Sequence, residues 1–144
     1  MLFRIVGCAL LAACVAACRG SDNGTGPTGI SSSILHARMG DATTFLDERG
    51  RPINGQWPGS PSPVEHDILT GSAANGTLLP GLTCGDWTSE SATTRGQVGH
   101  SDGLGPGRST AGALSSWNSA HASQSCANTA PGGGAGRIYC FARN

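Results

Sequence analysis

Histidine and acidic residues are the side chains of this 144-residue chain with the clearest capacity for chemistry. His66 with Asp67, His100 with Asp102, and His121 offer the imidazole nitrogens and carboxylate oxygens that bind zinc. Because no close pair such as His-x-x-x-His is present, buried histidines bonded to aspartate or backbone explain the same residues. Two interpretations stay open: a zinc site with His66, His100 and His121 as metal ligands, or three structural histidines.

Two patterns of hydrolytic enzymes are present only formally. Gly99-His-Ser-Asp-Gly103 matches the Gly-x-Ser-x-Gly motif of serine hydrolases, with His121 as the available base. That motif acts between a buried strand and a helix of a large α/β sheet, and neither flank here has that character. Glycosidase carboxylates must lie close together in space, which the sequence does not establish for its acidic residues (Glu48, Glu65, Asp67, Asp86, Glu90). We therefore predict no catalytic residues and no enzymatic activity.

The beginning of the chain has the features of an export signal. Arg4 supplies a positive charge, and residues 5–17 form an apolar stretch that is too short to span a bilayer as a stable helix. We predict a signal peptide at residues 1–18. An ordinary secretory signal is the alternative to a lipoprotein signal.

Two tetrapeptides in this region have the pattern of a bacterial lipoprotein cleavage box. Leu11-Ala-Ala-Cys14 and Val15-Ala-Ala-Cys18 each place two small residues between an aliphatic residue and a cysteine. Cys18 is the predicted lipidation site, because lipidation of Cys14 would leave an unusually short apolar core. The polar, glycine-rich residues 19–33 are predicted to form a flexible tether.

A chain with this beginning is expected in the cell envelope. We predict a lipid anchor in the outer or cytoplasmic membrane and a domain at residues 34–144 that faces the periplasm or the exterior, where disulfides persist. Nine basic and nine acidic residues balance, so no net charge favours nucleic acid. The lipid anchor is thus the only predicted membrane contact.

Short strands joined by long loops are the expected elements of this domain. Residues 64–71 and 113–117 are candidate strands, and residues 137–142 form the clearest one. Residues 89–112 are polar and glycine-rich, which predicts a long loop. The pattern is typical of an α+β or mostly-β domain.

Five motifs follow one another in the second half of the chain: His66-Asp-Ile-Leu-Thr-Gly-Ser72, Thr83-Cys-Gly-Asp-Trp87, Val98-Gly-His100, Ser116-Trp-Asn-Ser-Ala-His121 and Tyr139-Cys-Phe141. Taken in this order, they resemble a family of bacterial exported lectin-like proteins. The family belongs to the C-type-lectin-like fold, which also includes endostatin-type domains, and the resemblance extends from Leu35 to the C-terminus. It implies an α+β fold with mostly short antiparallel strands and long loops.

The same resemblance implies a role for each of the three cysteines outside the signal. Cys84 and Cys126 correspond to the disulfide of the long-loop region, and Cys140 to the cysteine of the final strand. The usual partner of that last cysteine lies in an N-terminal half that contains a helix and has no counterpart here. We therefore expect Cys140 to be unpaired and the domain to be partial.

Sugar binding through calcium is the best-known activity of this fold. The resemblance retains Trp117-Asn118, but Ser119 replaces the aspartate that follows in sugar-binding members, and no Glu-Pro-Asn motif is present. Asn118 is therefore also interpreted as a hydrogen-bonding brace of its loop, and Trp117 as a core residue. Calcium and zinc are the two candidate cofactors.

The predicted function is that of a lipid-anchored binding or adhesion module, whose partner is a glycan or a surface protein. A zinc-binding domain or metal-dependent hydrolase is one alternative, and a truncated relative without function is another. The candidate ligand-binding residues are Asp86, Trp87, His100, Asp102, Asn118 and His121.

Overall fold

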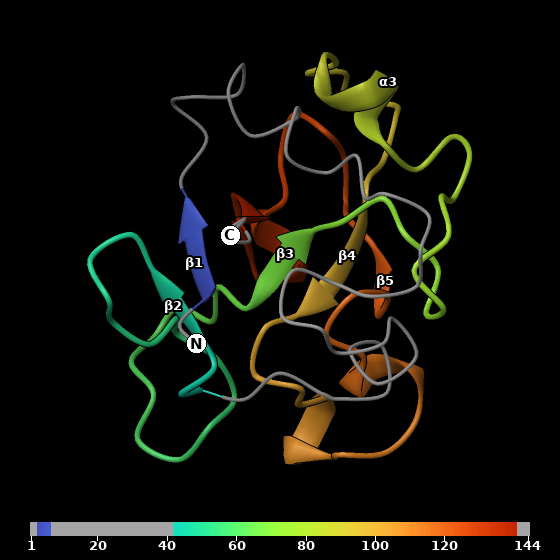
Figure 1. Cartoon of the computed structure of the whole chain (residues 1–144). Helices are drawn as coiled ribbons and strands as arrows, with labels where there is room; N and C mark the ends of the chain where they lie inside the picture. Colours follow the sequence, from blue (N-terminus) through green and yellow to red (C-terminus); the bar gives the residue numbers. More distant parts are fainter. Residues whose placement is uncertain (1–2, 7–41, 141–144) are drawn as a thin grey trace.

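A mixed six-stranded sheet organises the chain in the computed structural model, which describes residues 3–6 and 42–140 (Figure 1). The strand order is β2-β1-β6-β3-β4-β5. Helical elements within the described residues are short: α3 (Cys84–Trp87) and the 3-10 turns η3 (Pro106–Arg108), η4 (Ala113–Ser115) and η5 (Ala130–Gly132). The strands are β1 (Phe3–Val6), β2 (Phe45–Asp47), β3 (Asp67–Leu69), β4 (Gln97–His100), β5 (His121–Ala122) and β6 (Gly134–Cys140).

The sheet combines antiparallel and parallel pairings. The pairs β1–β6, β3–β4 and β4–β5 are antiparallel, whereas β1–β2 and β3–β6 are parallel. An α+β class with short strands and long loops is therefore confirmed. One of the two parallel pairs, β3–β6, lies at the centre of the sheet and joins strands that are far apart in sequence.

Two of the three expected strands are present. β3 lies within residues 64–71, and β6 covers most of the strand expected at residues 137–142 but begins earlier, at Gly134. The strand expected at residues 113–117 is wrong, because this segment forms the 3-10 turn η4.

The prediction of one continuous loop at residues 89–112 is also wrong, because it contains β4. All four β4 residues are buried, although Gln97 and His100 are polar. A Cβ atom on Gly99 would collide with the backbone of Trp117, so this strand needs glycine where the loop packs against it. Its composition thus reflects tertiary contacts, and a local pattern of polarity does not reveal it.

The strand β1 lies within the predicted signal peptide. It pairs parallel with β2 and antiparallel with β6. The remainder of the signal, both candidate lipidation cysteines and the tether lie outside the described residues, so cleavage, lipidation and membrane anchoring stay predictions. No helix in the described part of the chain has the length and apolar character needed to cross a membrane.

A disulfide joins Cys84 to Cys126, as the resemblance implied. Cys84 begins α3, whose residues all have positive φ: 50° for Cys84, 62° for Gly85, 55° for Asp86 and 66° for Trp87. This is one turn of left-handed helix, a conformation that disfavours non-glycine residues. The disulfide therefore anchors a turn that local propensity alone would not select. Cys140 ends β6 and is not part of this disulfide.

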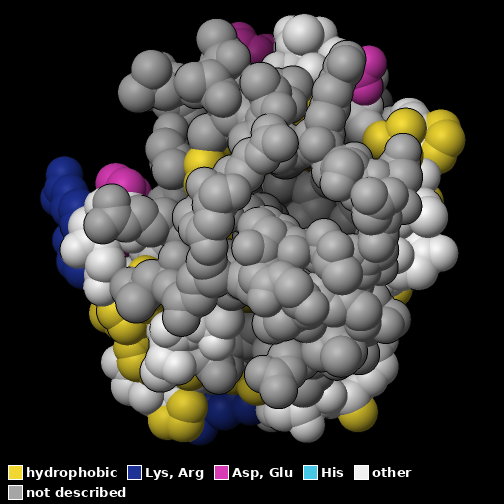
Figure 2. Space-filling view, in the orientation of Figure 1, with side chains coloured by type: hydrophobic (Ala, Val, Ile, Leu, Met, Phe, Trp, Pro, Cys, Tyr) yellow, Lys and Arg dark blue, Asp and Glu magenta, His cyan; other side chains and the backbone are white. Residues whose placement is uncertain are grey.

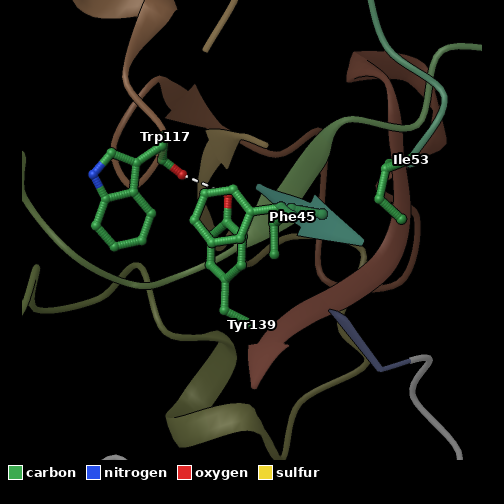
Figure 3. Packing of buried hydrophobic residues seen from close by; sticks show 5 residues of the cluster. Phe45, Ile53, Trp117 and Tyr139 are labelled. Carbon is green, nitrogen blue, oxygen red and sulfur yellow. Dashed lines mark hydrogen bonds between the residues drawn. The ribbon is translucent and has the colours of Figure 1, made fainter. Parts of the chain in front are cut away.

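Among the described residues, the apolar core cluster is small and rich in aromatic side chains (Figure 3). Phe45 packs against Trp117 and Tyr139, with ring centroids 5.7 and 4.6 Å away. The Tyr139 hydroxyl donates to the Trp117 carbonyl at 2.8 Å, so its burial leaves no polar atom unmatched. Ile53 and Ile68 complete the cluster. A core of this size gives limited stabilisation, which makes covalent or metal cross-links valuable.

Both basic and acidic side chains are visible among the described residues at the rim of the face shown in Figure 2. This distribution fits the balanced composition of the whole chain.

Asp47, at the end of β2, holds the following turn together. Its carboxylate accepts from the Arg49 and Arg51 amides, each at 2.9 Å, and from Arg51 Nε at 2.8 Å. Burial acts to raise the pKa of Asp47, but these hydrogen bonds outweigh it and lower the pKa below its ordinary value.

Replacing this carboxylate, Asp47→Asn, is expected to reduce the free energy of unfolding by about 1 kcal/mol at pH 7. Since the folded-state pKa is lowered, the contribution is complete above the unfolded pKa of about 4 and is lost as the pH falls through the folded value. Urea unfolding of both proteins at several pH values measures this. A stability difference that stayed constant down to pH 2 would contradict it.

Candidate metal centre

Three histidine side chains converge on one buried carboxylate, that of Asp67. Nε2 of His66 and of His100 lie 3.6 and 3.3 Å from Asp67 Oδ1, and Nε2 of His121 lies 3.5 Å from Oδ2. The His66 and His100 rings are stacked with centroids 4.0 Å apart. The structure thus brings together the three histidines that the sequence offered as metal ligands.

Strand pairing explains this convergence. Asp67 begins β3 and His100 ends β4, and the two residues are direct partners in the antiparallel ladder. His121 begins β5, which pairs with β4 on its other side. The pairing of β3 with β6 shifts register between Asp67 and Ile68, so the chain is irregular where His66 enters the site. Three neighbouring strands therefore carry Asp67, His100 and His121, and His66 immediately precedes the first of these strands.

The protonation of each ring follows from the partner of its Nδ1 atom. His100 Nδ1 lies 2.8 Å from the Leu104 carbonyl and His121 Nδ1 lies 3.0 Å from the Ala122 carbonyl. A carbonyl oxygen only accepts, so both Nδ1 atoms must carry the donated proton. The same assignment holds for His66, because its Nδ1 faces an Asp102 carboxylate oxygen at 2.8 Å.

A neutral imidazole protonated at Nδ1 presents an unprotonated Nε2, which is an acceptor. The three Nε2 atoms and the Asp67 carboxylate therefore form a cluster of acceptors that face one another. Within the described part of the chain, both Asp67 oxygens and His100 Nε2 are buried without a hydrogen-bond partner. Such a cluster is unfavourable alone and favourable around a cation.

Burial shifts the pKa of two of these groups toward their neutral forms. It raises the pKa of Asp67 to about 6, against the opposing effect of the His121 and His66 charges. It also lowers the pKa of His100 to about 4, and the neighbouring His66 acts in the same direction. A bound cation favours a carboxylate and neutral imidazoles, which is the state that zinc binding requires.

Three of the four donors lie close enough together for one ion: one ligand atom each from His66, Asp67 and His100 lies within 4.8 Å of the others, and His121 is not part of this set. Bonds of 2.0–2.1 Å in a tetrahedron place neighbouring ligand atoms about 3.3–3.4 Å apart. The three nitrogen–oxygen distances at Asp67 are 3.3, 3.5 and 3.6 Å. Charge-assisted hydrogen bonds from protonated histidines would be shorter, at about 2.7–2.9 Å. The geometry therefore favours a metal centre over a network of ion pairs.

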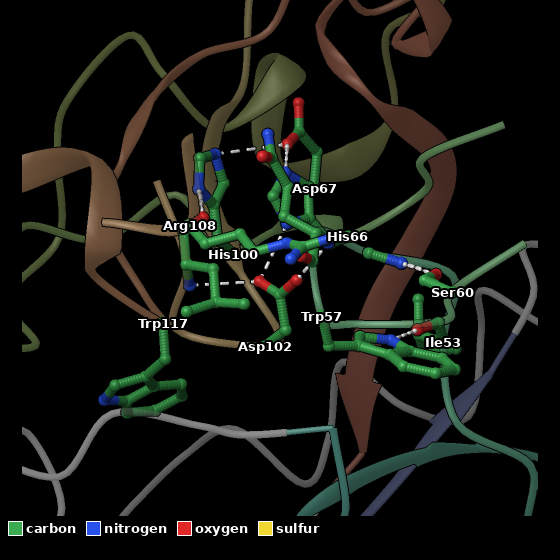
Figure 4. A network of polar contacts seen from close by, with 12 residues as sticks. Ile53, Trp57, Ser60, His66, Asp67, His100, Asp102, Arg108 and Trp117 are labelled. Carbon is green, nitrogen blue, oxygen red and sulfur yellow. Dashed lines mark hydrogen bonds and ion pairs between the residues drawn. The ribbon is translucent and has the colours of Figure 1, made fainter. Parts of the chain in front are cut away.

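Asp102 supports the centre without facing it. Figure 4 shows Asp67 and Asp102 on opposite sides of the His66 ring. Besides His66 Nδ1, the Asp102 carboxylate accepts from the Gln56 amide at 2.6 Å and the Leu104 amide at 3.1 Å. Burial acts to raise the pKa of Asp102, but the hydrogen bond from His66 and those from the backbone lower it. Its oxygens thus accept hydrogen bonds from within the fold, and contact of Asp102 with an external ligand stays a prediction.

Substituting this support, Asp102→Asn, is expected to weaken zinc affinity tenfold to a hundredfold, because it removes the carboxylate that orients His66. Competition against a chromogenic chelator measures the affinity. Asp86→Asn, which changes an exposed carboxylate on α3, is the matched control and should leave it unchanged. Equal affinities for wild type and Asp102→Asn would show that the His66 orientation does not depend on this contact.

Asn118 was a candidate ligand-binding residue, and its geometry is instead that of a brace. It is 2% exposed, its Nδ2 donates to the Ala73 carbonyl at 3.0 Å, and its Oδ1 accepts from Ser116 at 3.0 Å. The Asn118 carbonyl accepts from Thr70 at 2.6 Å. This network joins two loops and leaves no side-chain oxygen directed outward for calcium.

The remaining candidates, Asp86 and Trp87, lie apart from the histidines. Thr83, which precedes α3, bridges to Gly96 at the start of the β4 region, whereas His100 is at the end of β4. A Cβ on Gly71, just beyond β3, would be 3.0 Å from the Trp87 ring. The α3 turn therefore lies at the opposite end of the β3–β4 pair, and the six candidates do not share one surface.

Asp67 is the acceptor on which the three rings converge. The sequence offers it as an oxygen donor beside His66, within residues that also have the pattern of an ordinary strand. The signal was its position next to a histidine at the start of an apolar strand, where a buried carboxylate needs a partner.

No protein-family model, curated protein or solved structure matches this chain. The function of the centre is therefore inferred from its own geometry, and the lectin-like resemblance stays an expectation.

Proposed function

We propose that this protein is a zinc-binding domain whose ion is held by His66, Asp67, His100 and His121. The observation that supports this most strongly is the orientation of the three rings. Each donates Nδ1–H to an oxygen acceptor and directs an unprotonated Nε2 at the same buried carboxylate. Histidines bound to zinc in proteins have this arrangement, in which an outer acceptor fixes the tautomer.

The donor set selects among metals. Calcium takes six to eight oxygen ligands, so a cluster with three imidazole nitrogens does not suit it. Imidazole and carboxylate donors suit zinc, and copper or nickel would compete through their higher or comparable affinity for nitrogen. Zinc is the proposed ion because it takes imidazole and carboxylate donors, and the ligand atoms of His66, Asp67 and His100 lie within 4.8 Å of one another.

The proposed ion would stabilise the domain. His66 and Asp67 belong to the β3 region, His100 to β4 and His121 to β5, so one ion cross-links three neighbouring strands. Four protein donors are also the number found in structural zinc sites. The Cys84–Cys126 disulfide would act in the same way at the opposite end of the β3–β4 pair.

The setting we propose is the cell envelope, in a lectin-like scaffold of the C-type-lectin-like fold. The order of the motifs and the Cys84–Cys126 pairing support this proposal. In such a scaffold the zinc ion would hold the loops that carry a binding surface for a glycan or a surface protein.

Metal analysis tests the zinc site directly. We expect the purified protein, dialysed against zinc, to retain one zinc ion per chain by mass spectrometry and to bind it in a saturable calorimetric titration. His100→Ala should lose this binding, because it removes a buried donor, whereas Asp86→Asn should retain it. A wild-type protein that bound no zinc, copper or nickel would refute the proposal.

A further inference from the structure

The four proposed ligands are not equally enclosed. The side chains of His66, Asp67 and His100 are 3%, 1% and 5% exposed, whereas that of His121 is 30% exposed. The ligand atoms of the first three lie within 4.8 Å of one another and form a compact set. His121 approaches from the other side of the carboxylate and contacts Oδ2, whereas His66 and His100 contact Oδ1. The centre therefore has three inner ligands and one outer ligand.

The outer ligand is also the one with the least support. Asp102, which is 36 positions away in sequence, fixes the His66 ring, and Leu104 in the loop after β4 fixes the His100 ring. The His121 ring donates to the carbonyl of the adjacent Ala122 and packs edge-on against the His100 ring, with centroids 5.1 Å apart. Its strand, β5, has two residues and lies at the edge of the sheet. Of the three imidazoles, that of His121 would move at the lowest cost.

Gly132 leaves space beside this ligand. It is exposed, and a Cβ atom placed on it would lie 2.8 Å from Asp67 Oδ2 and 3.2 Å from His121 Cε1. Any side chain larger than hydrogen would therefore crowd the solvent side of the centre. Asp67 Oδ2 is itself buried, so Gly132 is the exposed position from which a side chain would press on this oxygen and on the His121 ring.

Resting on the zinc site proposed above, we infer that His121 is an exchangeable ligand and that a small carboxylate ligand from solvent takes its position on the ion. Zinc with one carboxylate and three neutral imidazoles keeps a net positive charge, which favours an anion as the incoming group. Three protein ligands with one exchangeable position is the arrangement of zinc sites that bind external molecules. The exchange forms one metal–oxygen bond and breaks the bond to His121 Nε2, with no change in oxidation state.

Cobalt(II) substitution makes this exchange visible, because its visible absorption reports the ligands and their number. We expect His121→Ala to bind cobalt about tenfold to a hundredfold more weakly than wild type, and His100→Ala to bind none under the same conditions. Acetate added to cobalt-loaded His121→Ala should give a saturable spectral change, at concentrations at least about tenfold lower than in wild type. Imidazole should restore the wild-type spectrum to this variant.

A second substitution tests whether the external carboxylate binds beside Gly132. Gly132→Ala in the His121→Ala background should weaken acetate binding, because its methyl group takes the space beside Asp67 Oδ2. Loss of cobalt from His121→Ala as complete as from His100→Ala, or a spectrum that acetate and imidazole leave unchanged, would overturn the exchange while the zinc site stands. A wild-type protein that bound neither cobalt nor zinc would instead overturn the zinc site and the exchange together.

Discussion

Removing zinc with a chelator is expected to lower the melting temperature of this protein by about 20 °C. Free zinc at about 1,000 times its dissociation constant stabilises the folded state by about 4 kcal/mol, and a domain of this size loses several degrees for each kcal/mol. The protein should regain its original melting temperature when zinc is restored.

The reason for so large an effect is the composition of the interior. The apolar cluster has five residues, and beside it lie the buried polar side chains of His66, Asp67, His100 and Asp102. Without a cation, the Asp67 oxygens and His100 Nε2 face one another unpaired within the described structure, and this costs free energy that an apolar core would not incur. The proposed zinc ion would both remove that cost and join three strands.

Differential scanning fluorimetry with zinc and with chelator measures the shift. His100→Ala should melt at a low temperature that zinc does not raise, and Asp86→Asn should behave as wild type. A melting temperature that chelator leaves unchanged in zinc-loaded wild type would show that the ion, if bound, does not stabilise the fold.

Replacing both cysteines of the disulfide, in Cys84→Ser/Cys126→Ser, is expected to lower the free energy of unfolding by about 4 kcal/mol. The two residues are 42 positions apart, and a cross-link that closes a loop of this length strongly restricts the unfolded chain. The left-handed turn Cys84–Trp87 begins at this bond, and its residues have unfavourable positive φ values. Loss of the bond should therefore also release this turn.

Urea unfolding of the variant and of reduced wild type, both loaded with zinc, measures this effect. The two proteins should agree, because each lacks the same cross-link. A loss below about 1 kcal/mol would mean that loop closure contributes little, as occurs when the unfolded chain retains structure.

The strands could be predicted where the local pattern of apolar residues matches the burial of the strand in the fold. The apolar residues of β3 and β6 alternate or cluster as strands do, and both were expected. β4 was missed because Gln97 and His100 are polar and Gly99 is a poor strand residue. Its strand character comes from two flanking strands and from the backbone of Trp117, which no local window contains.

The site divides in the same way. His66, His100 and His121 were candidate ligands by residue type alone, and the resemblance implied the pairing of Cys84 with Cys126. The sequence does not predict the different positions of the two aspartates. Asp67 faces the Nε2 atoms of all three rings, whereas Asp102 contacts Nδ1 of His66 alone among these rings. Both are aspartates beside or near a histidine, and only the strand pairing distinguishes them.

The residue types alone show which atoms are available: imidazole nitrogens, a few carboxylates, and too few apolar side chains for a large core. The folded chain adds that three Nε2 atoms meet at Asp67 and that His121 is the most exposed of the three histidines. These features could not be predicted because tautomer, register and enclosure depend on contacts between distant segments. The local sequence around the histidines and Asp67 does not predict these contacts. They include the hydrogen bonds to the carbonyls of Leu104 and Ala122, the pairing of Asp67 with His100, and the position of η5.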